Sequence, residues 1–170
     1  MTDPLTLIKL IVLYMLDKVD FPLSKAQIFD FILEKEYTHY FNLQIAMHEL
    51  SEGGLINDEQ MHSVTLLTIT DRGRDTLKYF QGRISDGIKN DITTYLQDNR
   101  VELHNEVSIT TNYYRIGAGE YVAELSAREK SSELVSIKLT VPNESAAETI
   151  CNNWKEQNQD IYSYLLSNLL

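Results

Sequence analysis

The order of patterns between Ser24 and Thr70 constrains the fold of this chain more than any other feature of its sequence. Ser24 and Gln27 have the spacing of a capping box, which predicts that a helix begins there. Asn42 is a favourable N-cap residue and predicts the start of a second helix, over residues 42–52. The apolar residues of this second helix recur three and four apart: Leu43, Ala46, Met47 and Leu50. The segment therefore predicts two helices joined by a turn.

Two glycines and a hairpin complete this segment. Gly53 or Gly54 is expected to adopt the left-handed conformation that ends a helix. A short strand is predicted at residues 55–56, a polar hairpin tip at 57–63 and a returning strand at 64–69. Helix, turn, helix, glycine and two short strands thus follow one another, and a further helix is predicted from Thr70 onward.

The composition is that of an ordinary globular protein with an acidic excess. The chain has 170 residues, of which 43% are hydrophobic and 24% charged, and its net charge is −10. The excess is shared, because residues 1–82 carry 7 basic and 12 acidic side chains and residues 83–170 carry 8 and 13. Since affinity for nucleic acid comes largely from Lys and Arg on phosphates, neither half is a basic DNA-binding module. The single cysteine, Cys151, excludes an internal disulfide and is typical of the reducing cytoplasm.

The first predicted helix, over residues 5–18, is apolar on all sides and must bury more than one face. It is too short to span a membrane, which takes roughly 20 residues, and no membrane partner is expected. Either other parts of the chain or a second subunit must cover it. A connecting helix over residues 83–100 carries a narrow isoleucine stripe that also suits helix packing. The expected homodimer contacts are therefore Ile8, Ile11, Met15, Ile84, Ile88 and Ile92.

Residues 101–170 are predicted to form a small sheet domain. Apolar and polar residues alternate over 101–113, 121–128 and 135–141, which predicts a three-stranded antiparallel sheet with one solvated face. Two helices are predicted to cover the other face, the first starting at a capping box of Ser145 and Glu148. This domain would act as a sensor or in dimerisation. Tyr113, Tyr121 and Trp154 would line a ligand pocket in the first case, although a core position is the simpler interpretation of all three.

Two motifs carry a resemblance to a known family. They are Leu50-x-x-Gly53-Gly54-Leu55-Ile56 and Leu67-Thr68-Ile69-Thr70-Asp71-x-Gly73-Arg74. In these motifs the first half of the chain resembles winged helix-turn-helix transcriptional regulators of the MarR and PadR type. The whole chain also resembles an uncharacterised bacterial domain-of-unknown-function family. The resemblance implies a cytoplasmic, homodimeric transcriptional regulator, and the predicted fold class is α+β: a winged helix-turn-helix domain (1–82), the connecting helix, and the sheet with two helices.

In such a protein the second helix of the motif would bind double-stranded DNA. Polar side chains on its outward face, Asn42, Gln44 and His48, are the expected base-reading residues. The expected phosphate contacts lie around that helix: Lys25, Tyr40, Arg72 and Arg74.

Other residues of the same surface favour a protein partner instead. Glu49 and Glu52 would repel phosphates, and the predicted hairpin tip carries no Lys or Arg. Phe41 and Ile45 face outward, and exposed apolar patches more often mark protein contacts. A winged helix that recognises a protein is therefore the alternative.

The sequence gives no positive sign of catalysis, a metal or a cofactor. The histidines at positions 39, 48, 62 and 104 have no metal-binding spacing, and Cys151 lies on an apolar stripe. Gly117 and Gly119 fit a hairpin turn better than a phosphate loop. No enzyme activity is expected.

Overall fold

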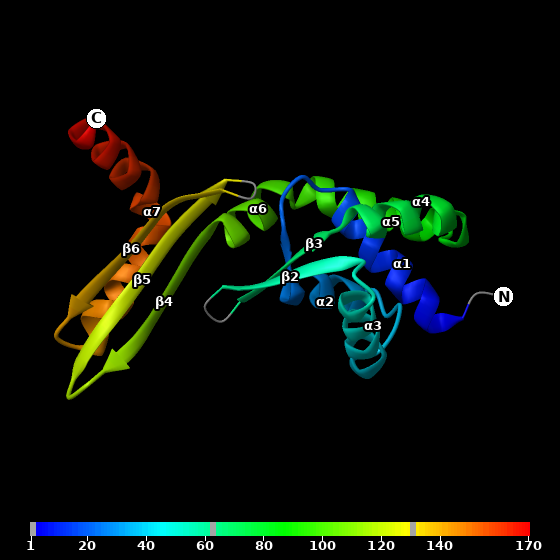
Figure 1. The fold of residues 1–170 in the computed structure, drawn as a ribbon, viewed down its shortest axis with the longest axis horizontal. Helices are drawn as coiled ribbons and strands as arrows, with labels where there is room; N and C mark the ends of the chain where they lie inside the picture. Colours follow the sequence, from blue (N-terminus) through cyan, green and yellow to red (C-terminus); the bar gives the residue numbers. More distant parts are fainter. Residues whose placement is uncertain (1–2, 62–63, 130–131) are drawn as a thin grey trace. The chain divides into compact units, whose positions relative to one another are not determined.

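A computed structural model describes residues 3–61, 64–129 and 132–170, and it divides into two compact units (Figure 1). The described residues form seven α-helices and two three-stranded antiparallel sheets, which makes the chain an α+β protein. The units are Met1–His104 and Asn105–Leu170. In the described ranges, every helix is too short or too polar to cross a membrane.

The first unit contains the predicted succession of helices and strands. Its elements are α1 (Pro4–Asp17), β1 (Leu23–Ser24), α2 (Lys25–Glu34), α3 (Tyr40–Glu52), β2 (Ile56–Met61), β3 (Val64–Ile69), α4 (Asp71–Phe80), the 3-10 turn η1 (Gln81–Arg83) and α5 (Asp86–Asp98). A further helix, α6 (Arg100–Ser108), spans the division between the units. The sheet has the order β1-β3-β2, and the two-residue β1 was not predicted.

Helix α1 is the centre of the first unit. Eight of its residues are buried, and it contacts α3, α4, α5 and β3. Because one chain covers it on several sides, its all-round apolar pattern is satisfied without a second subunit. The predicted dimer contacts Ile8, Ile11, Met15, Ile84 and Ile92 are all at most 2% exposed, and Ile88 is half-buried. These side chains form the core of the unit rather than a surface.

The start of α2 was predicted correctly, whereas the start of α3 was not. The backbone amide of Gln27 donates to Ser24 Oγ at 3.0 Å, and the amide of Ser24 donates to Gln27 Oε1 at 2.9 Å. In α3 the N-cap is His39, not Asn42, and it makes no side-chain cap hydrogen bond. Tyr40 packs edge-on against Phe29 of α2, and this tertiary contact accompanies the earlier start of the helix.

The hairpin after α3 has a longer first strand than predicted. Residues 57–61, expected in the tip, continue β2 and pair with β3 from Asn57↔Thr68 to Met61↔Val64. Backbone pairing with β3 therefore overrides the polar composition of this segment. The last two positions of the predicted tip, 62 and 63, lie outside the described residues.

The second unit is a sheet covered by one helix. It contains β4 (Ile109–Ile116), β5 (Glu120–Glu129), β6 (Ser132–Val141) and α7 (Glu144–Leu169), with the strand order β4-β5-β6. The first predicted strand was wrong over its initial half, because residues 100–108 form α6. Leu103 and Val107 are four apart and both buried, whereas Val101 is 74% exposed. That burial has the period of a helix.

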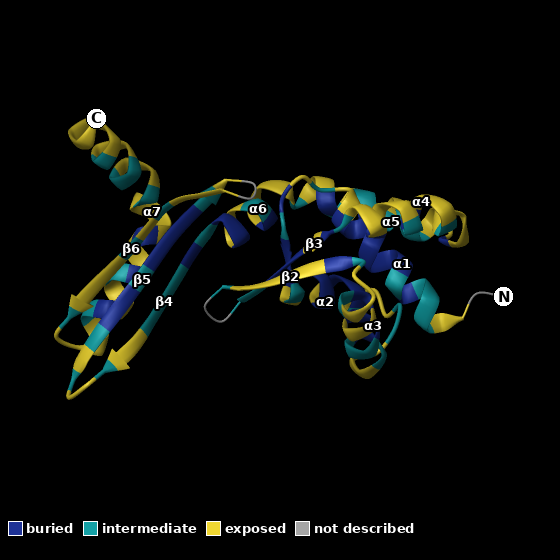
Figure 2. Cartoon of the chain, viewed as in Figure 1, coloured by how far each residue is buried: buried dark blue, intermediate teal, exposed yellow. Residues whose placement is uncertain are grey.

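Helix α7 corrects the prediction of two C-terminal helices. It is continuous, and residues 155–160 contain no Gly or Pro to interrupt it. Its N-cap is Asn143, whose Oδ1 accepts from the amide of Ala146 at 2.8 Å, so the predicted capping box of Ser145 and Glu148 is not the helix start. The first half of α7 covers the sheet through one buried cluster: Ala123, Leu125, Ala127, Ala147, Cys151 and Trp154. Figure 2 shows this buried stripe along β5.

Candidate functional site

An open hollow of about 380 Å³ lies between α3 and the β2–β3 hairpin. Its polar lining comes from α2, α3 and the hairpin: Lys25, Gln44, His48, Ser51, Glu52, Asp58, Gln60 and Thr65. The apolar side chains Met47, Ile56 and Leu67 complete it. We refer to this hollow as the α3 groove.

The glycine motif fixes the hairpin against the end of α3. Gly54 has a φ of 71°, and the amides of Gly54 and Leu55 donate to the carbonyls of Ser51 and Leu50. This is a Schellman ending, which satisfies the last helical carbonyls and turns the chain sharply. The geometry of the turn is therefore encoded locally, and it places β2 beside the exposed face of α3.

The second motif joins the same turn to α4. The Thr70 hydroxyl donates to the carbonyl of Gly54 at 2.8 Å and accepts from the amide of Gly73 at 3.0 Å. At Gly73 a Cβ atom would lie 2.1 Å from the carbonyl oxygen of Leu55, so only glycine fits this close approach. Both motifs that carried the resemblance thus hold the backbone beside the α3 groove.

Three of the seven predicted DNA-binding residues line the α3 groove. Gln44 and His48 lie one turn apart on α3, and Lys25 stands at the start of α2 with its ammonium 5.3 Å from the centre of the Phe29 ring. Tyr40 is 58% exposed, and its hydroxyl accepts from Gln44 Nε2 at 2.6 Å. The structure therefore gathers four of the predicted side chains around one exposed face of α3.

Like Tyr40, the remaining three predicted residues do not line the groove. Asn42 is half-buried in the first turn of α3, and Arg72 is exposed on α4. Arg74 is engaged in two ion pairs, with Asp71 (Nη1–Oδ1 3.1 Å) and with Asp17 (Nε–Oδ1 3.7 Å). Because this side chain is about half-exposed, its pairs are weak and exchangeable.

Acidic and amide side chains surround the basic ones. The β2 positions 57–60 are all exposed, visible as the yellow strand in Figure 2, and they include Asp58 and Glu59. Ser51 Oγ donates to Asp58 Oδ1 at 3.3 Å, which links α3 to this strand. On the other side of α3, Lys9 pairs with Glu49 and neutralises one of the carboxylates that would repel phosphate.

Apolar side chains also reach the surface near the start of α3. Phe41 is 71% exposed and Ile45 is half-buried, so neither is enclosed within the chain. This is the arrangement expected from the outward positions of both residues in the sequence. It keeps a protein contact available as an alternative use of α3.

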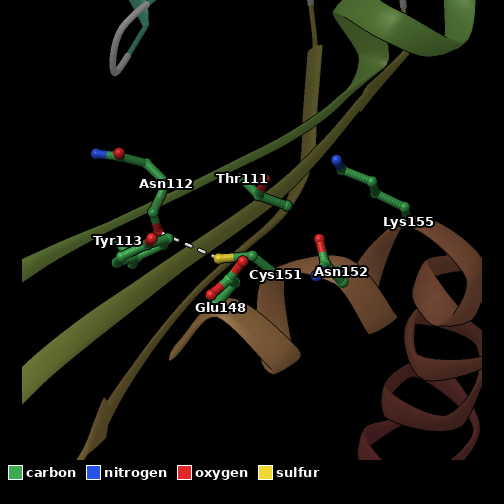
Figure 3. A pocket seen from close by; sticks show the side chains of 7 residues that line it. All are labelled: Thr111, Asn112, Tyr113, Glu148, Cys151, Asn152 and Lys155. Carbon is green, nitrogen blue, oxygen red and sulfur yellow. Dashed lines mark hydrogen bonds between the residues drawn. The ribbon is translucent and has the colours of Figure 1, made fainter. Parts of the chain in front are cut away.

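A second hollow, of about 520 Å³, lies in the second unit between β4 and α7 (Figure 3). Its lining is mostly polar: Thr111, Asn112, Tyr113, Glu148, Cys151, Asn152 and Lys155. Of the three aromatics predicted for a ligand pocket, Tyr113 is among these residues. Trp154 is buried in the core, where its indole N–H donates to the carbonyl of Ser126 at 3.0 Å, and Tyr121 packs against the same core.

Cys151 and Tyr113 in this second hollow favour their protonated forms. Burial raises the pKa of the Cys151 thiol, which donates to the carbonyl of Asn112 at 3.6 Å. Burial, together with the nearby carboxylates of Glu144 and Glu148, raises the pKa of the Tyr113 hydroxyl. A protonated thiol is a poor nucleophile, so the hollow offers hydrogen-bond donors rather than a reactive group. Among the described residues, no group of three His, Cys, Asp or Glu side chains is arranged to hold a metal ion.

One family model matches nearly the whole chain, over residues 8–169. The chain belongs to the family described as Domain of unknown function (DUF4364). Comparisons with curated proteins and with solved structures gave no significant match.

Two contacts around α3 in this DUF4364 member have no signal in the predicted elements. One is the Lys9–Glu49 ion pair, which joins α1 to α3 across forty residues of chain and has no local signal. The other is the contribution of Gln60 and Thr65, which pair directly across β2 and β3 and whose side chains share a hydrogen bond of 2.7 Å. An earlier recognition of residues 57–61 as a strand would have predicted this second feature.

Proposed function

We propose that the first unit is a winged helix-turn-helix that binds double-stranded DNA, with α3 as the recognition helix, and that the protein regulates transcription. One observation carries the proposal. Gln44 and His48 lie one turn apart on an exposed helix face and share a groove with Lys25 beside a two-stranded hairpin. A single exposed α-helix fits the width of the major groove, and side chains one turn apart reach neighbouring base pairs.

Each side chain has a role that follows from its chemistry. The Gln44 amide would contact an adenine through N6 and N7, and His48 would donate to an acceptor on the next base pair. Lys25 and the Tyr40 hydroxyl would contact the phosphates that flank the groove, with Arg72 and Arg74 as further contacts from α4. Arg74 would exchange Asp17 and Asp71 for a phosphate, which costs little because exposed ion pairs are weak.

The number of basic contacts predicts how steeply the affinity for DNA depends on the salt concentration. With Lys25, Arg72 and Arg74 as the basic contacts, about three phosphates are neutralised per copy. The logarithm of the affinity should then fall against the logarithm of the salt concentration with a slope of about −3 for each copy bound. The acidic residues of β2 further weaken binding to arbitrary DNA. The protein should therefore bind selected sequences and bind mixed DNA poorly.

The test is selection of duplexes from a random-sequence pool with the intact protein, followed by fluorescence anisotropy on the enriched duplex at low and physiological salt. Gln44→Ala combined with His48→Ala should weaken binding by at least about 30-fold, since each good base contact contributes roughly 1–3 kcal/mol. Arg72→Ala should reduce the magnitude of the salt slope by about one. Gln97→Ala, an exposed glutamine on α5, is the matched control and should leave binding unchanged.

Binding of the enriched duplex that survives the double Gln44 and His48 substitution would overturn the proposed recognition helix. Failure to enrich any duplex at low salt would favour the second candidate function, recognition of a protein by α3. The exposed Phe41 beside Ile45 favours that candidate, because apolar surface contributes little to phosphate binding. In that case Phe41→Ala, and not Gln44→Ala, should abolish crosslinking of the intact protein to its partner.

A further inference from the structure

The last three turns of α7 present an apolar surface that the second unit does not cover. Ile161 is the last residue of α7 packed against the buried cluster of the sheet. Beyond it, Tyr164 is 66% exposed, Leu166 42% and Leu169 78%. In Figure 1 the final, red part of α7 extends clear of the strands of its own unit.

This surface continues the face of α7 that packs on the sheet. Leu165 follows Trp154 by eleven residues, or three helical turns, and therefore points to the same side of the helix. Large apolar and aromatic side chains occupy a broad arc around this direction, bounded by Tyr164 on one side and Leu166 on the other. Within it, Ile161, Tyr162 and Leu165 are half-buried and Leu169 is exposed. The opposite side carries Glu156, Asp160, Ser163 and Ser167 at helical spacing. The helix end is thus amphipathic and lacks a partner for its apolar side within the unit.

We propose that this apolar end of α7 is a homodimer contact, in which two copies of the chain pair their α7 helices in antiparallel orientation. The ten residues from 161 to 170 contain no charged side chain, whereas the whole chain has a net charge of −10. Two copies, each acidic overall, can therefore meet here without bringing charged side chains of the same sign together. At other surfaces of the chain, repulsion between acidic side chains would oppose such a contact.

The size of the surface also fits a second copy. The apolar face of a helix can be covered by the equivalent face of a second helix, whose side chains pack into the grooves of the first. The apolar side chains of two such ends would bury on the order of 1,000 Å², which is the lower limit for a specific interface. The contact does not depend on DNA binding by the first unit.

The experiment is light scattering coupled to size-exclusion chromatography of the intact protein over the micromolar range. The wild-type mass should be twice the 19.6 kDa of the chain. Leu169→Glu, at a position 78% exposed, should raise the dimer dissociation constant by at least about tenfold without disturbing the core. Leu165→Glu, nearer the centre of the surface, should have a larger effect. Ser163→Glu places the same charge on the polar side and should leave the mass unchanged.

A second measurement tests whether the dimer forms through this end of α7 or through another surface of the chain. Amide hydrogen exchange of residues 160–170 should slow as the protein concentration rises through the dissociation constant, and Leu169→Glu should remove that dependence. A monomer mass at the highest concentration would overturn the proposal. A dimer that both glutamate variants leave intact would also overturn it. Either outcome leaves the DNA-binding test unaffected.

Discussion

The two units solve the problem of burying apolar residues in different ways. The first unit surrounds α1, so that one helix is covered by helices and a strand on several sides and eight of its residues are buried. The second unit covers one face of a sheet with part of one helix, and three of the six residues in its buried cluster are alanines. The first core therefore has many large buried side chains. In the second, Trp154 is the largest buried side chain, and partly buried residues such as Tyr121 and Ile137 pack against the cluster.

The two faces of the sheet in the second unit also differ in composition. In the second unit the side of β5 opposite to α7 carries polar pairs, since Ser126 contacts the Thr110 hydroxyl and Glu124 accepts from the Tyr114 hydroxyl at 3.1 Å. The Ser126 and Thr110 side chains are nevertheless buried, so this face of the sheet is polar but not uniformly solvated. Because only the first half of α7 covers the sheet, the second half of this helix has no partner within the unit. The proposed dimer contact lies on this second half.

Trp154→Ala should have the largest effect on the free energy of unfolding, and it should destabilise the second unit while the first unit stays folded. Removing a large buried side chain costs about 3–5 kcal/mol, and Trp154 is the largest fully buried side chain of this core. Amide exchange should show loss of protection in β4, β5 and β6 with the helices of the first unit unchanged. Trp154→Phe, which keeps most of the packing and loses the hydrogen bond to Ser126, should cost far less. Equal loss of protection in both units would contradict the comparison.

Gly73→Ala should destabilise the first unit by about 2 kcal/mol, because the new Cβ would collide with the Leu55 carbonyl and Ile69 and force the turn to shift. Urea unfolding followed by far-ultraviolet circular dichroism measures the total change. Fluorescence of Trp154, the only tryptophan, reports the second unit and should be unaffected. Gly82→Ala is the matched control, since nothing lies within 4 Å of its Cβ position. A similar loss in both variants would exclude the steric explanation.

Tyr37→Phe should have the smallest effect of the three substitutions on the free energy of unfolding, and it tests a single contact within the first unit. The Tyr37 hydroxyl donates to Asp91 Oδ2 at 2.6 Å and joins the turn before α3 to α5, so its loss should cost about 1 kcal/mol near neutral pH. Burial, and then the Asp91 carboxylate, raise the pKa of Tyr37 well above its ordinary value.

The pH dependence of this contact has a definite sign. Because the folded-state pKa of Tyr37 is raised, the contribution to stability is complete below the unfolded pKa of about 10 and is lost as the pH rises beyond it. Urea unfolding at pH 8 and above pH 10 should show a smaller loss of stability in Tyr37→Phe than in the wild type. Tyr79→Phe, at an 83% exposed position, should behave as the wild type, and identical losses in all three proteins would refute the assignment.

The local signals of the sequence were reliable where a side chain caps or ends an element next to it. The capping box at Ser24, the turn at Gly54 and the hairpin glycines Gly117 and Gly119 all occupy the expected positions. The strand predicted from residue 101 was wrong because an alternating pattern and a helical pattern share Leu103 and Val107. Burial of these two residues, with Val101 exposed, decided between the periods.

Prediction of the candidate site was similarly divided. The sequence named Lys25, Gln44 and His48, and these residues share the α3 groove. It also named Arg74, but Asp17 lies on a different helix, and no sequence pattern indicates that it holds this guanidinium. The partners of charged side chains come from distant segments, so they are set by packing and not by local spacing.

By itself, the sequence determined where most helices and strands lie, the order of the motif around α3, and the acidic surface beside it. Each of these follows from short-range spacing, capping and composition. Only the tertiary structure decided what covers α1, that the predicted dimer residues are core residues, and that α7 continues past its sheet with an apolar face. Hydrophobic periodicity indicates that one face of a helix or strand is buried. It does not identify the surface that covers this face, because that surface is assembled from segments far apart in the chain.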